Sequence, residues 1–307
     1  MEQAIALEPE PTQRAAQSRS YRQRVEQLSK SSVQKYYRAF HDIEWDAAEN
    51  QIERSDPRLE LRPDSPLGES AWYRAQAPTV RAELGLEMAC QVLKFGIGFE
   101  SVLSRGLLEY AGTLDNRSPE RRYVLHEVIE ECQHSLMFQE LIDRSGSDPA
   151  PVGRLPAFID RRIARCGATF PELFFFAVLS GELFIDAENR AQLRTATHPL
   201  LRRILHIHIT EEARHVRFAQ LYLERSLPAL SAARTRFLRW VMPTMLRDAQ
   251  RLMLSPTPRL QGHYRIPRAV MLECYGPGSR HRQQVEHIAA PIFALLGDPG
   301  RALRVFA

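Results

Sequence analysis

Two copies of a Glu-x-x-His motif are the residues of this sequence whose types and spacing could do chemistry. The first copy is Glu131 to His134 and the second is Glu212 to His215. Residues three apart on a helix lie on the same face, so each copy can offer a carboxylate and an imidazole to one ion. Among ten histidines, roughly one such match is expected by chance, so either copy alone is a weak indication of a metal site.

A third histidine strengthens the second copy. In the stretch HIHITEEARH, residues 206–215, His208 lies four residues before Glu212 and seven before His215. At roughly 100° per residue, these offsets place the three side chains within about 60° of one another. The neighbouring His206 lies six residues before Glu212 and is turned about 120° off that stripe. The segment therefore offers three aligned donors.

Two further glutamates complete a pattern. Glu100 and Glu182 lie among apolar neighbours, each in the predicted helix that precedes a Glu-x-x-His helix. The order Glu, Glu-x-x-His, Glu, Glu-x-x-His on four successive predicted helices is that of carboxylate-bridged di-iron centres in four-helix bundles. Anionic oxygens would bridge and neutralise two ions about 3–4 Å apart. Mixed nitrogen and oxygen ligands suit iron or manganese, and the lack of thiolates disfavours structural zinc.

The alternative for each residue alone is a buried polar group with satisfied hydrogen bonds. Together, however, the four glutamates favour a cation site, because converging buried carboxylates without cations carry a large desolvation penalty. No run of lysines or arginines is placed in these helices to neutralise them. We therefore favour a metal centre over a purely structural helical protein.

The elements that must position these residues are helices. Apolar residues recur with helical spacing over about 78–114. Ser118 and Pro119 form an N-terminal signal for a second helix, which stops near Gly146. We expect two more central helices over about 170–193 and 199–225, and peripheral helical segments over about 12–43, 229–254, 267–274 and 283–296.

No strand is predicted, so the fold class is all-α. We expect a ferritin-like four-helix bundle over about 78–226 with additional N- and C-terminal helices, in a single domain spanning residues 1–307. Residues 1–12 are rich in Pro and Glu and are expected to be disordered. Gly96 and Gly98 interrupt the first central helix, and close helix packing is favoured there over room for a substrate.

Composition excludes several classes of protein. The formal net charge of +4 is small and the arginines are scattered, so no nucleic-acid partner is predicted. Four cysteines without a CxxC pair argue against a zinc ribbon or a disulfide framework. The N-terminus lacks the apolar core of a signal peptide. The longest apolar run, FPELFFFAVL, is too short to span a bilayer. We expect a cytoplasmic protein with no membrane association.

In the segments that carry these residues, the sequence resembles the AurF family, the p-aminobenzoate N-oxygenases and related arylamine oxygenases. The resemblance covers most of residues 80–220 and lies in FESVLSRGLLEYA, HEVIEECQH, LSGELFID and HIHITEEARH. The family is a ferritin-like bundle with seven protein ligands, the seventh being a histidine four residues before the last glutamate. The resemblance implies that the metal ligands here are Glu100, Glu131, His134, Glu182, His208, Glu212 and His215.

The resemblance also implies a function. It implies an O2-dependent non-haem di-iron monooxygenase that converts an aryl amine to hydroxylamine, nitroso or nitro products, in secondary metabolism. The cofactor would be two iron ions, with manganese as a substitute, and O2 the co-substrate. The glutamates of the two motifs, Glu131 and Glu212, would bridge the ions. Because the chain has no flavin or dinucleotide motif, a ferredoxin or reductase would donate the electrons. A homodimer is also expected. Asp186 is interpreted as a hydrogen-bonding partner of a ligand histidine.

Other functions fit the same residues. C–H hydroxylation of a small hydrophobic substrate is the main one, and a non-catalytic ferritin-like metal-binding protein, normally a shorter chain, is another. A ribonucleotide-reductase radical subunit would carry Tyr where this chain has Phe138, and an acyl desaturase would not explain His208. No arginine can be placed to grip a substrate carboxylate, so p-aminobenzoate itself is doubtful as the substrate. Glu130 and Glu211 are interpreted as solvated or paired with arginines.

Overall fold

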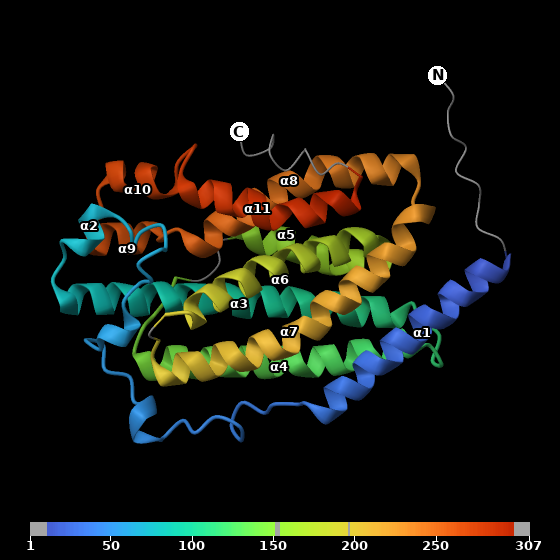
Figure 1. Ribbon diagram of the computed structural model, residues 1–307, viewed down its shortest axis with the longest axis horizontal. Helices are drawn as coiled ribbons and strands as arrows, with labels where there is room; N and C mark the ends of the chain where they lie inside the picture. The colour runs from blue at the N-terminus through green and yellow to red at the C-terminus, as the bar shows by residue number, and fades with distance from the viewer. Residues whose placement is uncertain (1–10, 151–153, 196, 298–307) are drawn as a thin grey trace.

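Helices form almost all of the regular structure (Figure 1). The computed structural model describes residues 11–150, 154–195 and 197–297, and no strand occurs within these ranges. The all-α prediction is confirmed. Of the segment expected to be disordered, residues 1–10 lie outside the described ranges. Residues 11 and 12 instead begin the first helix, α1 (Pro11–Gln34).

Four long helices make up the centre of the bundle, each with a proline in its first turn, where the missing N–H has no helical acceptor. At the start of the second, the Ser118 side chain accepts a hydrogen bond from the backbone N–H of Arg121, and Gly146 ends that helix at a φ of 66°. These are the predicted start and stop signals. The four helices are α3 (Pro78–Gly112), α4 (Pro119–Ser145), α6 (Pro171–Leu193) and α7 (Pro199–Ser226).

One helix of this region is not predicted from the sequence. Helix α5 (Arg154–Thr169) lies between α4 and α6, so the four central helices are not successive in the chain. It crosses α3 closely, because a Cβ atom on Gly167 would lie only 2.0 Å from the carbonyl oxygen of Gly106. A glycine is therefore required at 167 for the two backbones to approach.

Additional helices surround the centre, as expected for both ends of the chain. Helix α1 packs against α4 and α7, while α8 and α11 cover α6 (Figure 1). Two short helices, α2 and α9, are not predicted. Besides α1 and α5, the elements outside the centre are α2 (Ala71–Arg74), α8 (Ala232–Leu254), α9 (Pro258–His263), α10 (Arg268–Tyr275), α11 (Arg280–Leu295) and the 3-10 turns Ala48–Asn50, Pro57–Leu59 and Leu227–Ala229.

The apolar run at the start of α6 lies in the protein core. Phe174, Phe175 and Phe176 are fully buried, and the ring of Phe175 packs edge-on against Tyr110 and Phe218. Within the described ranges, no helix combines the length and the apolar character that a membrane crossing requires. The four cysteines are all free, as the absence of a paired motif predicts.

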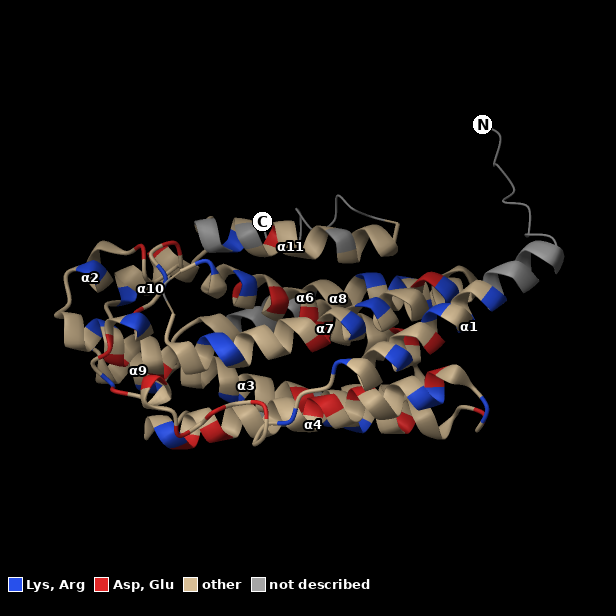
Figure 2. Ribbon diagram, turned by 60° about the horizontal axis from the view of Figure 1, so that its bottom comes forward, with Lys and Arg blue, Asp and Glu red and all other residues tan. Residues whose placement is uncertain are grey.

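Charged residues are distributed unevenly over the helices. Figure 2 shows acidic residues part-way along α4, α6 and α7, and it shows basic residues scattered over many helices in this view. Acidic residues in the middle of packed helices need a partner or a cation, because an unpaired buried carboxylate is strongly destabilising.

Candidate metal centre

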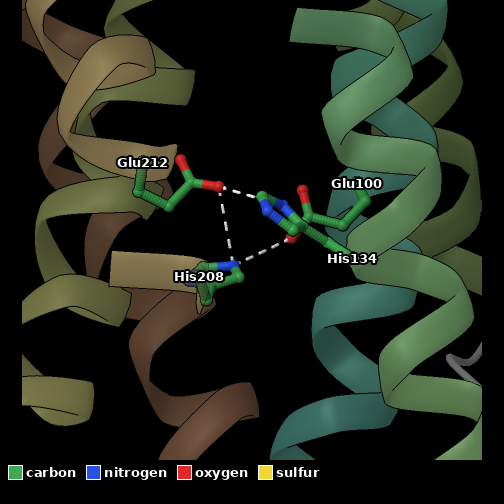
Figure 3. Close-up of side chains that lie close together, drawn as sticks. All are labelled: Glu100, His134, His208 and Glu212. Carbon is green, nitrogen blue, oxygen red and sulfur yellow. Dashed lines mark hydrogen bonds and ion pairs between the residues drawn. The ribbon is translucent and has the colours of Figure 1, made fainter. Parts of the chain in front are cut away.

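Eight buried acidic and histidine side chains from α3, α4, α6 and α7 meet at the centre of the bundle, and each is at most 1% exposed. Seven of them form two groups, within each of which the donor atoms lie within 4.8 Å of one another. The first group is Glu100, His134, His208 and Glu212 (Figure 3), and the second is Glu127, Glu131 and His215. The eighth residue is Glu182.

Glu131 and Glu212 lie between the two motif histidines. Nδ1 of His134 is 3.0 Å from Glu131 Oε2 and 3.2 Å from Glu212 Oε1. Nδ1 of His215 is 3.0 Å from Glu212 Oε2 and 2.8 Å from Glu131 Oε1. Each carboxylate therefore reaches both imidazoles, which is the placement that a bridging ligand requires.

His208 points into the same space from the N-terminal side of Glu212 on α7 (Figure 3). Its Nε2 atom is 3.4 Å from Glu100 Oε1 and 3.6 Å from Glu212 Oε1. The other ring nitrogen, Nδ1, is 3.2 Å from the side-chain amide nitrogen of Asn189. The ring thus presents one nitrogen to the centre while the amide holds the other.

Glu182 gives the clearest indication that a cation belongs here. It is completely buried, and neither of its carboxylate oxygens has a hydrogen-bond partner among the described residues. Glu100 Oε2 likewise has none within that part of the chain. Buried carboxylate oxygens are normally hydrogen-bonded or bound to metal. These oxygens, beside imidazole nitrogens and with no thiolate, fit a pair of iron or manganese ions.

The pKa values of the metal-free cluster indicate the same deficit of positive charge. Burial raises the pKa of Glu100 and Glu182 well above the usual range. Burial also favours neutral histidine, but contacts with Glu131, Glu211 and Glu212 outweigh it and raise the pKa of His134. Without a bound cation, these groups would therefore hold protons at the positions where a cation would otherwise neutralise the carboxylates.

A carboxylate supports each motif histidine from the opposite side. Nε2 of His134 is 2.9 Å from Glu211 Oε2, and Nε2 of His215 is 2.7 Å from Glu130 Oε2. Arg214 joins the two carboxylates, at 2.7 Å from Glu130 and 3.6 Å from Glu211. A carboxylate on the outer nitrogen fixes the ring orientation of a ligating histidine and increases its basicity.

The interpretation of Glu130 and Glu211 as solvated surface residues is therefore wrong, although the pairing with an arginine is correct. Both are buried, at 1% and 0% exposure. Successive residues on a helix are turned by roughly 100°, so each faces away from the ligand glutamate beside it. Glu130 of α4 faces α7 and contacts His215, and Glu211 of α7 faces α4 and contacts His134.

Asp186 is not brought to a ligand histidine. Its carboxylate accepts a hydrogen bond from Nε of Arg190, at 2.7 Å, on the outer side of α6. Within the described ranges, Asn189 makes the contact with a ligand histidine expected of Asp186. Asn189, seven residues after Glu182, is turned by only about 20° from it around the helix, whereas Asp186 is turned by about 40° to the other side, where it meets Arg190.

Phe138 closes one side of the first group. Its ring centroid is 5.3 Å from that of His208 and 6.3 Å from that of His134. A Cβ atom on Gly96 would lie 3.0 Å from Phe138 Cε2, so glycine makes room for the ring between α3 and α4. Close helix packing is thus the reason for Gly96, as predicted.

The chain matches the family model described as p-aminobenzoate N-oxygenase AurF over residues 18–300. It belongs to the AurF family. Similar proteins include an uncharacterized protein of Mycobacterium bovis and an uncharacterized protein of Mycobacterium tuberculosis, strain H37Rv. Each is 33% identical over 287 residues, covering 93% of this chain and 84% of the relative. No solved structure gives a significant match.

As an AurF-family member, the chain belongs to an oxygenase family that depends on di-iron centres, and it has a buried cluster that could hold two ions. The structure brings together all seven residues predicted as ligands: Glu100, Glu131, His134, Glu182, His208, Glu212 and His215. That these residues bind metal stays a prediction. Glu127, which lies beside Glu131 and His215, was not predicted from the sequence, although its spacing of four residues before Glu131 places both on one helix face.

Proposed function

We propose that this protein is an O2-dependent, non-haem di-iron N-oxygenase acting on a small aryl amine. The observation that carries the proposal is the pair of adjoining Glu and His groups, with unpartnered oxygens on Glu100 and Glu182, inside an AurF-family bundle. The seven predicted ligands would hold two iron ions, whose chemistry is the activation of O2 for transfer of one oxygen atom. Manganese would be a substitute.

The protein groups would set up this chemistry in distinct ways. Glu131 and Glu212 would bridge the ions, since each lies within reach of both motif histidines. Glu100 and Glu182 would supply further anionic oxygens from α3 and α6. Phe138 and the surrounding buried helices exclude water, which protects the site from side reactions.

A cavity of about 150 Å³ beside the candidate centre supports a small aromatic substrate. Met88, Val92 and Leu205 are part of its apolar wall. Asn189 also lines the cavity and contacts His208. An apolar cavity of roughly this volume holds one benzene ring. A larger surface hollow of about 750 Å³ lies between α1 and the start of α4. Neither space is lined by the candidate ligands, but the smaller cavity reaches His208 through Asn189.

The charges around this cavity favour a neutral amine over an aminobenzoate anion. The two arginines that line it are already paired. Arg58 contacts Asp56 at 2.5 Å, and Arg62 contacts Asp64 at 3.0 Å and Glu188 at 2.8 Å. A carboxylate on the substrate would have to compete with these pairs.

The first oxygenation consumes one amine, one O2, two electrons and two protons, and it yields one hydroxylamine and one water. The electrons must come from outside the chain, and we propose a ferredoxin or reductase as the donor. A second O2 would oxidise the hydroxylamine through the nitroso stage to the nitro product, with release of a second water.

The test begins with iron content. Purified protein is loaded anaerobically with Fe(II), and iron per chain is measured for the wild type and for Glu131→Ala and Glu212→Ala. We expect two iron ions in the wild type and a clear loss in both variants. Unchanged iron in the variants, or zinc in place of iron, would overturn the proposal.

The second step tests the reaction. Loaded protein, a chemical reductant and ¹⁸O2 are incubated with a panel of anilines, and products are identified by mass spectrometry. We expect ¹⁸O on nitrogen. Label on carbon would instead indicate a C–H hydroxylase, and bound iron without any product would indicate a metal-binding protein with no oxygenase activity on these amines.

A further inference from the structure

We propose that Glu127 is an additional metal ligand, an eighth donor beyond the seven-residue set. It lies on α4, four residues before Glu131. Its carboxylate forms the second group of the centre with Glu131 and His215, with donor atoms within 4.8 Å of one another. The inference rests on the proposed di-iron centre, and it concerns which protein atoms complete that centre.

The first argument is the correspondence between α4 and α7. Helix α4 carries Glu127, Glu131 and His134, and α7 carries His208, Glu212 and His215, with the same spacing of four and then three residues. The histidine of each helix faces the motif glutamate of the other, at 3.2 Å and 2.8 Å. The two triads are therefore related by an approximate two-fold rotation.

This relation gives Glu127 a defined place. His208 joins the group that contains the α4 histidine, His134. Glu127 joins the group that contains the α7 histidine, His215. Glu127 thus occupies on α4 the position that His208 occupies on α7, and the helix geometry that makes His208 a ligand applies equally to Glu127.

The second argument is the state of the carboxylate itself. Glu127 is 1% exposed, and its Oε2 atom has no hydrogen-bond partner among the described residues. The other buried glutamates of α4 that lie outside the centre are paired with arginines, Glu120 with Arg225 and Glu130 with Arg214. A cation beside Glu131 and His215 would supply the missing partner.

The third argument is the donor count at the second group. Apart from Glu212, the proposed second bridge, and Glu182, which both lie outside this group, its donors without Glu127 are one carboxylate and one imidazole. With Glu127 it has two carboxylates and one imidazole, a donor set that suits iron or manganese.

The experiment is an anaerobic titration of metal-free protein with Co(II), followed by visible absorption, for the wild type, Glu127→Gln, Glu127→His and the control Glu120→Gln. Glutamine keeps the shape but is a poor ligand, whereas histidine restores a donor like that of His208. The control removes a buried carboxylate from the same helix, outside the centre. A thermal melt of each metal-free variant checks folding.

We expect the second Co(II) ion to bind at least about tenfold more weakly in Glu127→Gln, with Glu127→His closer to the wild type and Glu120→Gln unchanged. The absorption of the bound Co(II) should also change in Glu127→Gln, because coordination sets that spectrum. Equal affinities and spectra for Glu127→Gln and the wild type would overturn the inference. If the wild type binds two ions but oxidises no amine, the proposed N-oxygenase reaction fails while the comparison at Glu127 still decides this inference.

Discussion

At the residue scale, the two motif histidines are held in the same way from opposite helices. His134 of α4 is supported by Glu211 of α7, and His215 of α7 by Glu130 of α4. Each supporting glutamate lies directly before the glutamate of the motif on its own helix. The arrangement couples the two helices, since neither histidine is oriented by its own helix alone.

The supporting carboxylates should therefore affect metal affinity without being ligands. We expect Glu211→Gln to weaken metal binding by about 10–100-fold, because the amide cannot hold the imidazole as firmly as a carboxylate. Competition with a chromophoric chelator measures the change. Glu140→Gln on the outer face of α4, where Glu140 pairs with Arg144, is the control. Equal affinity in Glu211→Gln and the wild type would show that the histidine needs no such support.

The metal-free protein should lose stability as the pH rises from about 6.5, the usual pKa of histidine, to about 8, the raised pKa of Glu127. Burial raises the pKa of Glu100 and Glu182, and of Glu127 to about 8, while carboxylate contacts overcome burial to raise that of His134. The folded state then binds more protons than the unfolded state in this range, so the free energy of unfolding decreases as those protons are lost. Burial lowers the pKa of His208 to about 4, which acts only at lower pH.

Chemical denaturation of chelator-treated protein at several pH values measures this trend. The affinity of the protein for metal should instead increase with pH over this range, because protons compete with metal for the same donors. A metal-free protein whose stability is flat or rises over this range would contradict the assignment of raised pKa values.

Spacing explains which site residues were predictable. Five of the seven predicted ligands follow from offsets of three and four, which fix the side chains that share a helix face. Glu100 and Glu182 follow from their mid-helix positions and their order along the chain, and the family resemblance implies the full set. Glu127 fits the same offsets, but a glutamate one turn from another is common on helices. The roles of Glu130 and Glu211 depend on which helix lies opposite, and that is a property of tertiary packing.

At the element scale, glycines determine how closely the helices approach. Gly181 of α6 meets the Phe99 ring of α3, where an added Cβ would lie 2.3 Å from the ring, next to Glu182 and Glu100. Gly167 of α5 meets the α3 backbone at Gly106. The bounds of the long helices were predictable from proline, serine and glycine signals. The contacts made by these glycines were not, because they depend on residues distant in sequence.

We expect Gly167→Ala to destabilise the protein by about 1–3 kcal/mol. The new methyl group would meet a backbone oxygen, which cannot move aside as a side chain can, so α5 would have to shift from α3. Thermal or chemical denaturation measures the loss. Gly112→Ala is the matched control, since no atom lies within 4 Å of its added Cβ. Equal stability of the two variants would show that the α3–α5 crossing tolerates a wider spacing.

At the scale of the whole molecule, the centre joins α3, α4, α6 and α7 through buried charge. Without cations, the buried carboxylates must either repel one another or take up protons. Bound ions remove that repulsion and link four helices at once, so metal should act as a stabilising ligand of the entire bundle.

Metal loading should therefore raise the unfolding temperature. An ion at one hundred times its dissociation constant contributes about 2.7 kcal/mol, so two ions would shift the transition by several degrees. Calorimetry with Mn(II), which is stable in air near neutral pH, measures the shift against chelator-treated protein. The double variant Glu131→Ala, Glu212→Ala should show no metal-dependent shift. A shift of equal size in that variant would place the binding elsewhere.

The position of α7 at the end of the bundle sequence has a consequence for biosynthesis. His208, Glu212 and His215 leave the ribosome last among the eight donors. A nascent or truncated chain that lacks α7 has the donors of α3, α4 and α6 but lacks the second Glu-x-x-His motif and His208. Iron capture should then follow completion of the bundle, so the iron content of a preparation would report the fraction of chains that reached the native fold.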